Sequence, residues 1–193
     1  MMLTAATPGV AVVSVAVNTT QDTHAVNPAA SALDASGNVS LRSAVEWADV
    51  QSSDSTITFD PTAFATAQTI RLTNGELDIT NTANSLTITG PSAPVTVDGR
   101  GLSNIFAVES GVTAEIDNLT ISNGKAASGG GILDDGSLTL NNDTLSHNTA
   151  TSNGGALGVV GGQLFAADTT FDSNTAGSGG AIYEDGPGMS TIT

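Results

Sequence analysis

The sequence predicts an all-β fold, a right-handed parallel β-helix (a solenoid of about five to six coils) with an N-terminal cap that contains one short helix. Three observations predict it: a repeat of fixed period, short apolar runs separated by turn residues, and a composition rich in small and β-branched side chains but only 4% aromatic. Residues 1–54 are expected to form the cap and residues 55–193 the β-helix, which we expect to be truncated at its C-terminal end.

The repeat is clearest in the second half of the chain. Gly-Gly pairs begin at Gly129, Gly154 and Gly179, at equal intervals, and short apolar runs separated by Asn, Asp, Ser and Gly surround them. Three strands of about three to five residues with their turns use about 22–26 residues, which is one coil of a parallel β-helix and matches the interval between the pairs. We therefore expect the Gly-Gly pairs to lie one above another in successive coils.

Asparagines recur near the corners of the same repeat. Asn123, Asn148 and Asn174 are predicted to occupy equivalent corners and to stack as a polar ladder that joins the coils by hydrogen bonds. Upstream, short alternating apolar runs predict further strands. These runs are Thr56–Phe59, Thr69–Leu72, Leu77–Ile79, Leu86–Thr89, Val95–Val97 and Ile105–Val108.

The segment 1–54 has a different pattern. Val10–Val17 predicts a strand, residues 18–38 a polar loop, and Ser40–Asp49 the one helix, with Ser40 as its N-cap. A solenoid needs a cover over its open end, because bare strand ends expose the core. We therefore expect this segment to be the cap, and Trp47, the only tryptophan, to plug the core.

The charge balance excludes some classes of partner. The net charge is -15, and the only Lys and Arg residues are Arg42, Arg71, Arg100 and Lys125. A surface this acidic repels phosphate backbones, so we expect no nucleic-acid binding. No segment is long and apolar enough to predict a membrane span, and the absence of cysteine excludes disulfides and thiolate chemistry.

Several motifs resemble those of known surface proteins. Ser40–Val45 resembles the motif of the CSLREA domain, although Val39 and Ser43 stand where that motif carries Cys and Glu. The later Asn-Thr-Ala and Gly-Gly-Ala repeats are similar to those of polymorphic outer-membrane-protein passengers. The resemblance implies a pectin-lyase-like right-handed β-helix, export, and an extracellular or bacterial cell-surface location.

The sequence favours a structural or adhesin-like module over an enzyme. Long faces of regularly spaced Thr, Ser, Asn and Asp suit multivalent contact with glycans or with a host or neighbouring cell surface. Because the chain stops within a new strand at Thr191–Thr193, we also expect end-to-end self-association.

The alternative is a pectate-type polysaccharide lyase or a glycoside hydrolase acting on acidic glycans. Arg71 and Arg100 lie about one coil apart and are the candidate bases of a lyase. Asp134 and Asp135 are the candidate carboxylates of a hydrolase, which needs two such groups on one face. Asp134-Asp135-Gly136 also has the composition of a tight turn.

No cofactor is expected, and Ca²⁺ is the only metal that the sequence suggests. Asp134, Asp135, Glu184 and Asp185 follow equivalent Gly-Gly segments and are the candidate Ca²⁺ ligands. They would lie on one face but two coils apart, roughly 10 Å, so one ion would need a further ligand between them.

Overall fold

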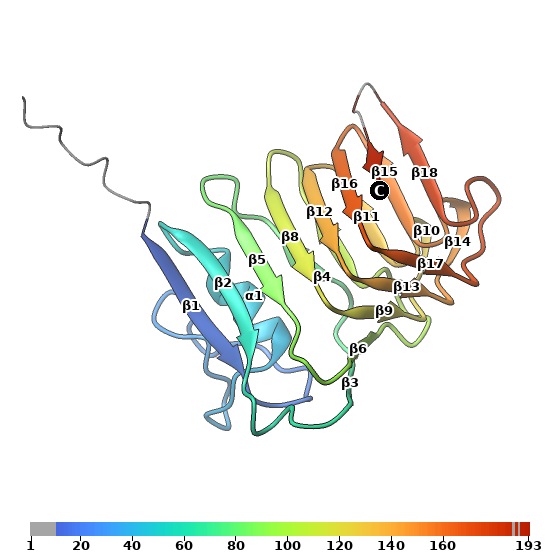
Figure 1. Ribbon diagram of the computed structural model, residues 1–193. Helices are drawn as coiled ribbons and strands as arrows, with labels where there is room; N and C mark the ends of the chain where they lie inside the picture. The colour runs from blue at the N-terminus through green and yellow to red at the C-terminus, as the bar shows by residue number, and fades with distance from the viewer. Residues whose placement is uncertain (1–10, 187, 189) are drawn as a thin grey trace, which may run out of the picture.

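The computed structural model describes residues 11–186, 188 and 190–193. The chain winds into a parallel β-solenoid of about five coils (Figure 1), which confirms the predicted fold class. The single helix lies at the N-terminal end, and the strands of successive coils run side by side along the solenoid.

Four parallel sheets form the walls of the solenoid. The first sheet contains β1 (Val12–Val17), β2 (Asp54–Phe59), β5 (Leu86–Thr89), β8 (Thr113–Asp117), β12 (Ser137–Asn141), β16 (Gln163–Ala167) and β19 (Thr191–Ile192). The second contains β3 (Gln68–Arg71), β6 (Val95–Asp98), β9 (Thr120–Ser122), β13 (Thr144–Ser146) and β17 (Thr170–Asp172). The third contains β4 (Leu77–Ile79), β7 (Phe106–Val108), β11 (Ile132–Asp134), β15 (Leu157–Val160) and β18 (Ile182–Asp185). A two-stranded sheet pairs β10 (Lys125–Ser128) with β14 (Thr149–Asn153).

The core is a stack of inward-facing aliphatic side chains. Ile116 of β8, Leu140 of β12 and Ala166 of β16 occupy one register position in three successive coils, and each is 0% exposed. Alternate residues of a strand point to opposite faces, so the intervening polar residues face outward. The short apolar runs of the sequence therefore fill a continuous interior.

The Gly-Gly pairs lie one above another. The N–H of Gly130 donates to the carbonyl of Gly154 at 3.0 Å, and the N–H of Gly155 donates to the carbonyl of Gly179 at 3.1 Å. Gly129, Gly154 and Gly179 have φ of 61°, 64° and 58°, a conformation that glycine adopts without the steric cost of a Cβ. The predicted stacking of the pairs is confirmed.

The predicted asparagine ladder is correct for two of its three members. Asn148 donates from Nδ2 to Oδ1 of Asn174 at 3.1 Å, and its own Oδ1 accepts the N–H of Gly124 at 2.8 Å. The prediction for Asn123 was wrong, because Gly124 occupies the equivalent position and Asn123 lies one residue earlier. At this corner Ser122 pairs with Ser146, a step one residue shorter than the interval between the Gly-Gly pairs, so a constant period misplaces Asn123.

The helix α1 (Leu41–Ala48) begins after the predicted N-cap. The hydroxyl of Ser40 accepts the N–H of Ser43 at 3.0 Å, and the hydroxyl of Ser43 accepts the N–H of Ser40 at 2.9 Å. Trp47 is partly buried and packs against the core, which fits its predicted place at the end of the solenoid.

The predicted strand at Val10–Val17 is present as β1, with Val10 outside the described residues. The described residues contain no helix with the length and hydropathy needed to cross a membrane.

Candidate functional site

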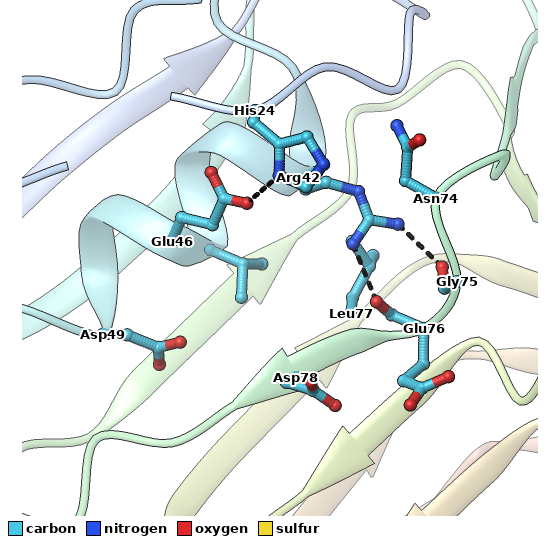
Figure 2. A pocket seen from close by; sticks show the side chains of 10 residues that line it. His24, Arg42, Glu46, Asp49, Asn74, Gly75, Glu76, Leu77 and Asp78 are labelled. Atoms are coloured by element: carbon cyan, nitrogen blue, oxygen red, sulfur yellow. Dashed lines mark hydrogen bonds and ion pairs between the residues drawn. The ribbon is translucent and has the colours of Figure 1, made fainter. Parts of the chain in front are cut away.

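A pocket lies between α1 and the first coil, with a volume of about 320 Å³ (Figure 2). Side chains of the helix line one wall, and the segment around β4 lines the other. Its carboxylates come from Glu46, Asp49, Glu76 and Asp78. We call it the cap pocket.

Arg42 fixes the cap to the first coil across this pocket. Its guanidinium is 2.7 Å from a carboxylate oxygen of Asp22 and donates to the carbonyls of Gly75 at 2.7 Å and Glu76 at 2.8 Å. Burial opposes ionisation of Asp22, but the hydrogen bonds from Arg42 and from the N–H of Thr73 hold its pKa below the usual value. Every strong contact of Arg42 therefore serves the joint between the cap and the coil.

Two acidic side chains of the cap pocket also serve structure. The N–H of Thr80 donates to Oδ1 of Asp49 at 2.9 Å, although burial raises the pKa of Asp49. Glu46 accepts the N–H of Ala25 at 2.8 Å and pairs with His24 at 2.5 Å. These carboxylates hold the loop and the turn against the helix, so the cap pocket is a joint between two parts of the fold.

A second site lies where the coils turn after the sheet of β3, β6, β9 and β13. It consists of two neighbouring open depressions, of about 450 and 310 Å³, that share Arg100. Arg100, Lys125 and His147 line the larger one, and Arg71 and Arg100 line the smaller one. We call these two depressions the cationic groove. It contains every Lys and Arg of the chain apart from Arg42.

The register of the sheet positions the first two cations of the groove. Arg71 ends β3 and pairs with Asp98 of β6 in the ladder, where their side chains form a loose ion pair at 3.8 Å. Asp98 is also held by two donors, the N–H of Arg100 at 3.0 Å and Nδ2 of Asn123 at 3.1 Å. The prediction that Arg71 and Arg100 lie one coil apart is confirmed, and the two side chains line one depression.

The other two basic residues come from the next two coils. Lys125 begins β10 and lies beside Thr149 of β14, and His147 occupies the corner directly after β13. Neither Arg100 nor Lys125 makes an ion pair within the described part of the chain. Neither Lys125 nor His147 was among the site residues predicted from the sequence. The usable signal was the scarcity of basic residues combined with their position just after consecutive strands of one sheet.

The candidate carboxylates of a hydrolase lie elsewhere. Asp134 ends β11 in a different sheet, and its side chain occupies the inward ladder between Val108 and Val159 with 0% exposure. Burial, opposed by the N–H of Gly136 and aided by the nearby charge of Asp135, raises its pKa to about 6. The structure thus brings Arg71 and Arg100 together at one depression. Asp134 lies elsewhere at the end of β11, and Asp135 lies in the turn after β11.

The candidate Ca²⁺ ligands have the spacing that the repeat predicts. Asp134 and Glu184 occupy one ladder position two coils apart, with Val159 between them. Within residues 11–186, 188 and 190–193, no three His, Cys, Asp or Glu side chains gather as a group that could hold a metal ion. The apolar Val159 occupies the place where a bridging ligand would be required.

The fold and the site together define a parallel β-solenoid with an acidic composition and one cationic groove. A family model, the Chlamydia polymorphic membrane protein repeat, matches residues 168–183. This segment runs from the turn before β17 to the start of β18 and includes the third Gly-Gly pair. No curated protein and no solved structure gives a significant match. The expected similarity to polymorphic-membrane-protein repeats is supported for this segment of the chain.

Proposed function

We propose that this chain is a β-helix module of the bacterial cell surface that serves as a scaffold and adhesive surface. The observation that carries the proposal is the match of residues 168–183 to a polymorphic membrane protein repeat, within the last of the stacked coils. We further propose that Ser40–Val45 starts the β-helix as in CSLREA-type surface proteins, a view supported by the capped helix at the end of the solenoid.

The outer face of the first sheet suits such a role. Thr56, Thr87, Glu115, Thr139 and Phe165 occupy one outward register position in five successive coils. Strands stack about 4.8 Å apart, so the row offers a weak contact at each coil, polar in the first four coils and aromatic at Phe165 in the fifth. Many weak contacts made together give strong attachment, which is how a module without a deep pocket can hold a surface.

We expect antibodies raised against this chain to label intact cells of the organism that produces it. We also expect beads coated with the folded chain to be retained on immobilised glycans more strongly than beads coated with the heat-denatured chain. Labelling that requires permeabilised cells, or equal retention of both kinds of bead, would contradict the proposal. Fluorescence microscopy and bead counts under flow are the measurements.

A polysaccharide lyase is the second candidate, because Arg71 and Arg100 line one depression. The carboxylate in that depression, Asp22, is engaged by the buried Arg42. We therefore expect binding of acidic glycans without turnover. Absorbance of unsaturated products, formed from uronic-acid polymers with Ca²⁺ and abolished by Arg100→Gly, would favour the lyase instead.

We also propose that the chain associates end to end. In the described residues, β17, β18 and β19 each end a sheet and pair on one side only, so their other backbone edges can accept a further strand. Light scattering of the whole chain should give a mass that grows with concentration. A monomer mass at every concentration would exclude such association.

A further inference from the structure

The basic residues of this chain are few and gather at one place. Nineteen acidic residues are spread along the sequence, against four Lys and Arg residues. Arg42 is 6% exposed and pairs with Asp22 inside the cap joint. The three remaining cations all line the cationic groove, so the groove is the region of the surface where an anion meets least repulsion.

These side chains form a row along the solenoid. Arg71 is the last residue of β3 in the first coil. Arg100, Lys125 and His147 follow β6, β9 and β13 by two, three and one residues, in the second, third and fourth coils. Successive coils are about 4.8 Å apart. The row therefore places one basic side chain on each of four successive coils, at different positions around the turn.

The backbone at Arg100 is a second, independent observation. Arg100 has φ of 56°, a left-handed conformation that disfavours side chains other than those of Asn, Asp and His. Glycine would occupy this turn at lower cost, and Gly99 and Gly101 flank it. Among the residues that the structure describes, Arg100 combines this disfavoured conformation with the lack of an ion-pair partner, at the point where the two depressions meet.

We infer that the cationic groove binds an acidic oligosaccharide with one carboxylate on each sugar ring, laid along the solenoid axis. The inference rests on the proposed surface function and names the ligand of that function. Arginine binds carboxylates through paired N–H groups, and lysine contributes a point charge. Asn123 and Thr149 also line the groove and supply amide and hydroxyl groups that match sugar hydroxyls.

Other ligand classes fit the groove less well. A nucleic acid or a densely sulfated chain carries a higher charge density and would meet the repulsion of a molecule with net charge -15. A single small anion would use one depression, of about 450 or 310 Å³, but not both. Asp98 lies among the cations, which disfavours a tightly packed polyanion and suits carboxylates spaced by neutral hydroxyl groups.

The test is a titration of the full chain with tetragalacturonate, followed by ¹H–¹⁵N NMR. We expect shifts at Arg71, Arg100, Lys125 and His147, and little binding of monomeric galacturonate or of the fully methyl-esterified tetramer. Arg100→Gly should raise the Kd about 10-fold, because it removes a charge-assisted hydrogen bond. Lys125→Gln should also raise the Kd.

The matched control is Ser173→Gly. Ser173 occupies the same corner in the fifth coil, has φ of 53°, and lines neither depression. We expect it to leave the Kd unchanged, and both glycine variants to keep a Tm no lower than that of the parent chain. Equal binding of the acid and its ester, an unchanged Kd in Arg100→Gly, or no binding at about 10 mM ligand would overturn the inference.

The same variants separate this inference from the proposed function. Beads coated with an Arg100→Gly, Lys125→Gln double variant should lose retention on uronate-coated surfaces. If they are retained like the parent while the parent adheres, the groove is not the adhesive site and the surface function stands. If tetragalacturonate binds in the groove but the parent beads do not adhere, the groove is upheld and the adhesive function fails.

Discussion

Replacing Gly155 by alanine is expected to lower the free energy of unfolding by about 4 kcal/mol or more. A Cβ at Gly155 would lie 2.1 Å from the carbonyl oxygen of Gly180 and 2.6 Å from the backbone nitrogen of Thr175. Both atoms belong to the backbone of the next coil, so no side chain can rotate away. The coils would have to separate at this corner, which would break the hydrogen bond from Gly155 to Gly179.

Gly180 supplies the matched control for this substitution. It occupies the equivalent position in the next Gly-Gly pair, but a Cβ there would meet only the carbonyl oxygen of Asn174, at 3.6 Å. Gly180→Ala should therefore change the stability of the whole chain by less than about 1 kcal/mol. Urea denaturation followed by circular dichroism measures both variants. Equal losses for Gly155→Ala and Gly180→Ala would show that coil-to-coil contact is not what requires glycine.

The stacking of these glycines was predictable because their spacing repeats. A residue that must approach the backbone of the next coil recurs once per coil, even where the loops between the strands differ in length. The corner of Asn123 was not predictable from the same spacing. The step from Ser122 to its partner Ser146 is one residue shorter than the interval between the Gly-Gly pairs, whereas the step from Ser146 to Asp172 is one residue longer, so the loops change length between coils. Only the register of the strands reveals which residues share a corner.

The cationic groove was partly predictable. The sequence indicated that Arg71 and Arg100 lie one coil apart, because runs of strand and turn residues separate them. It did not indicate that Lys125 and His147 join them, because that depends on where the corner falls in the third and fourth coils. The inward orientation of Asp134 was missed for a related reason. A shift of one residue in a strand exchanges its two faces, and Asp-Asp-Gly predicts a turn without fixing which aspartate ends the strand.

Asp134→Val is expected to stabilise the chain in a pH-dependent way. The carboxyl of Asp134 lies in an apolar ladder between Val108 and Val159, and its Oδ2 has no hydrogen-bond partner in the described structure. Burial raises its pKa from 3.8 to about 6. The folded chain thus holds this proton more tightly than the unfolded chain, so the stabilisation is complete below about pH 4 and is lost as the pH rises towards 6.

The size of the effect follows from the shift. About two pKa units correspond to about 3 kcal/mol, which the wild-type chain should lose between about pH 4 and pH 8 because of this group. Valine cannot ionise and continues the aliphatic ladder, but it leaves the N–H of Gly136 without its acceptor, at a cost of about 1 kcal/mol at every pH. The stability of Asp134→Val relative to wild type should therefore rise by about 3 kcal/mol from pH 4 to pH 8.

Urea denaturation at a series of pH values measures this difference, and two other carboxyls define the controls. Asp135→Asn removes a charge from the adjacent turn but keeps the buried carboxyl, so most of the pH dependence should remain. Asp143 will leave a residual slope in Asp134→Val, because burial raises its pKa to about 8 although it accepts the N–H groups of Leu119 and Asn141. A relative stability that stays constant from pH 4 to pH 8 would mean that Asp134 ionises in the folded chain at its ordinary pKa. Its carboxylate would then have to reach water, which is incompatible with a closed aliphatic ladder between Val108 and Val159.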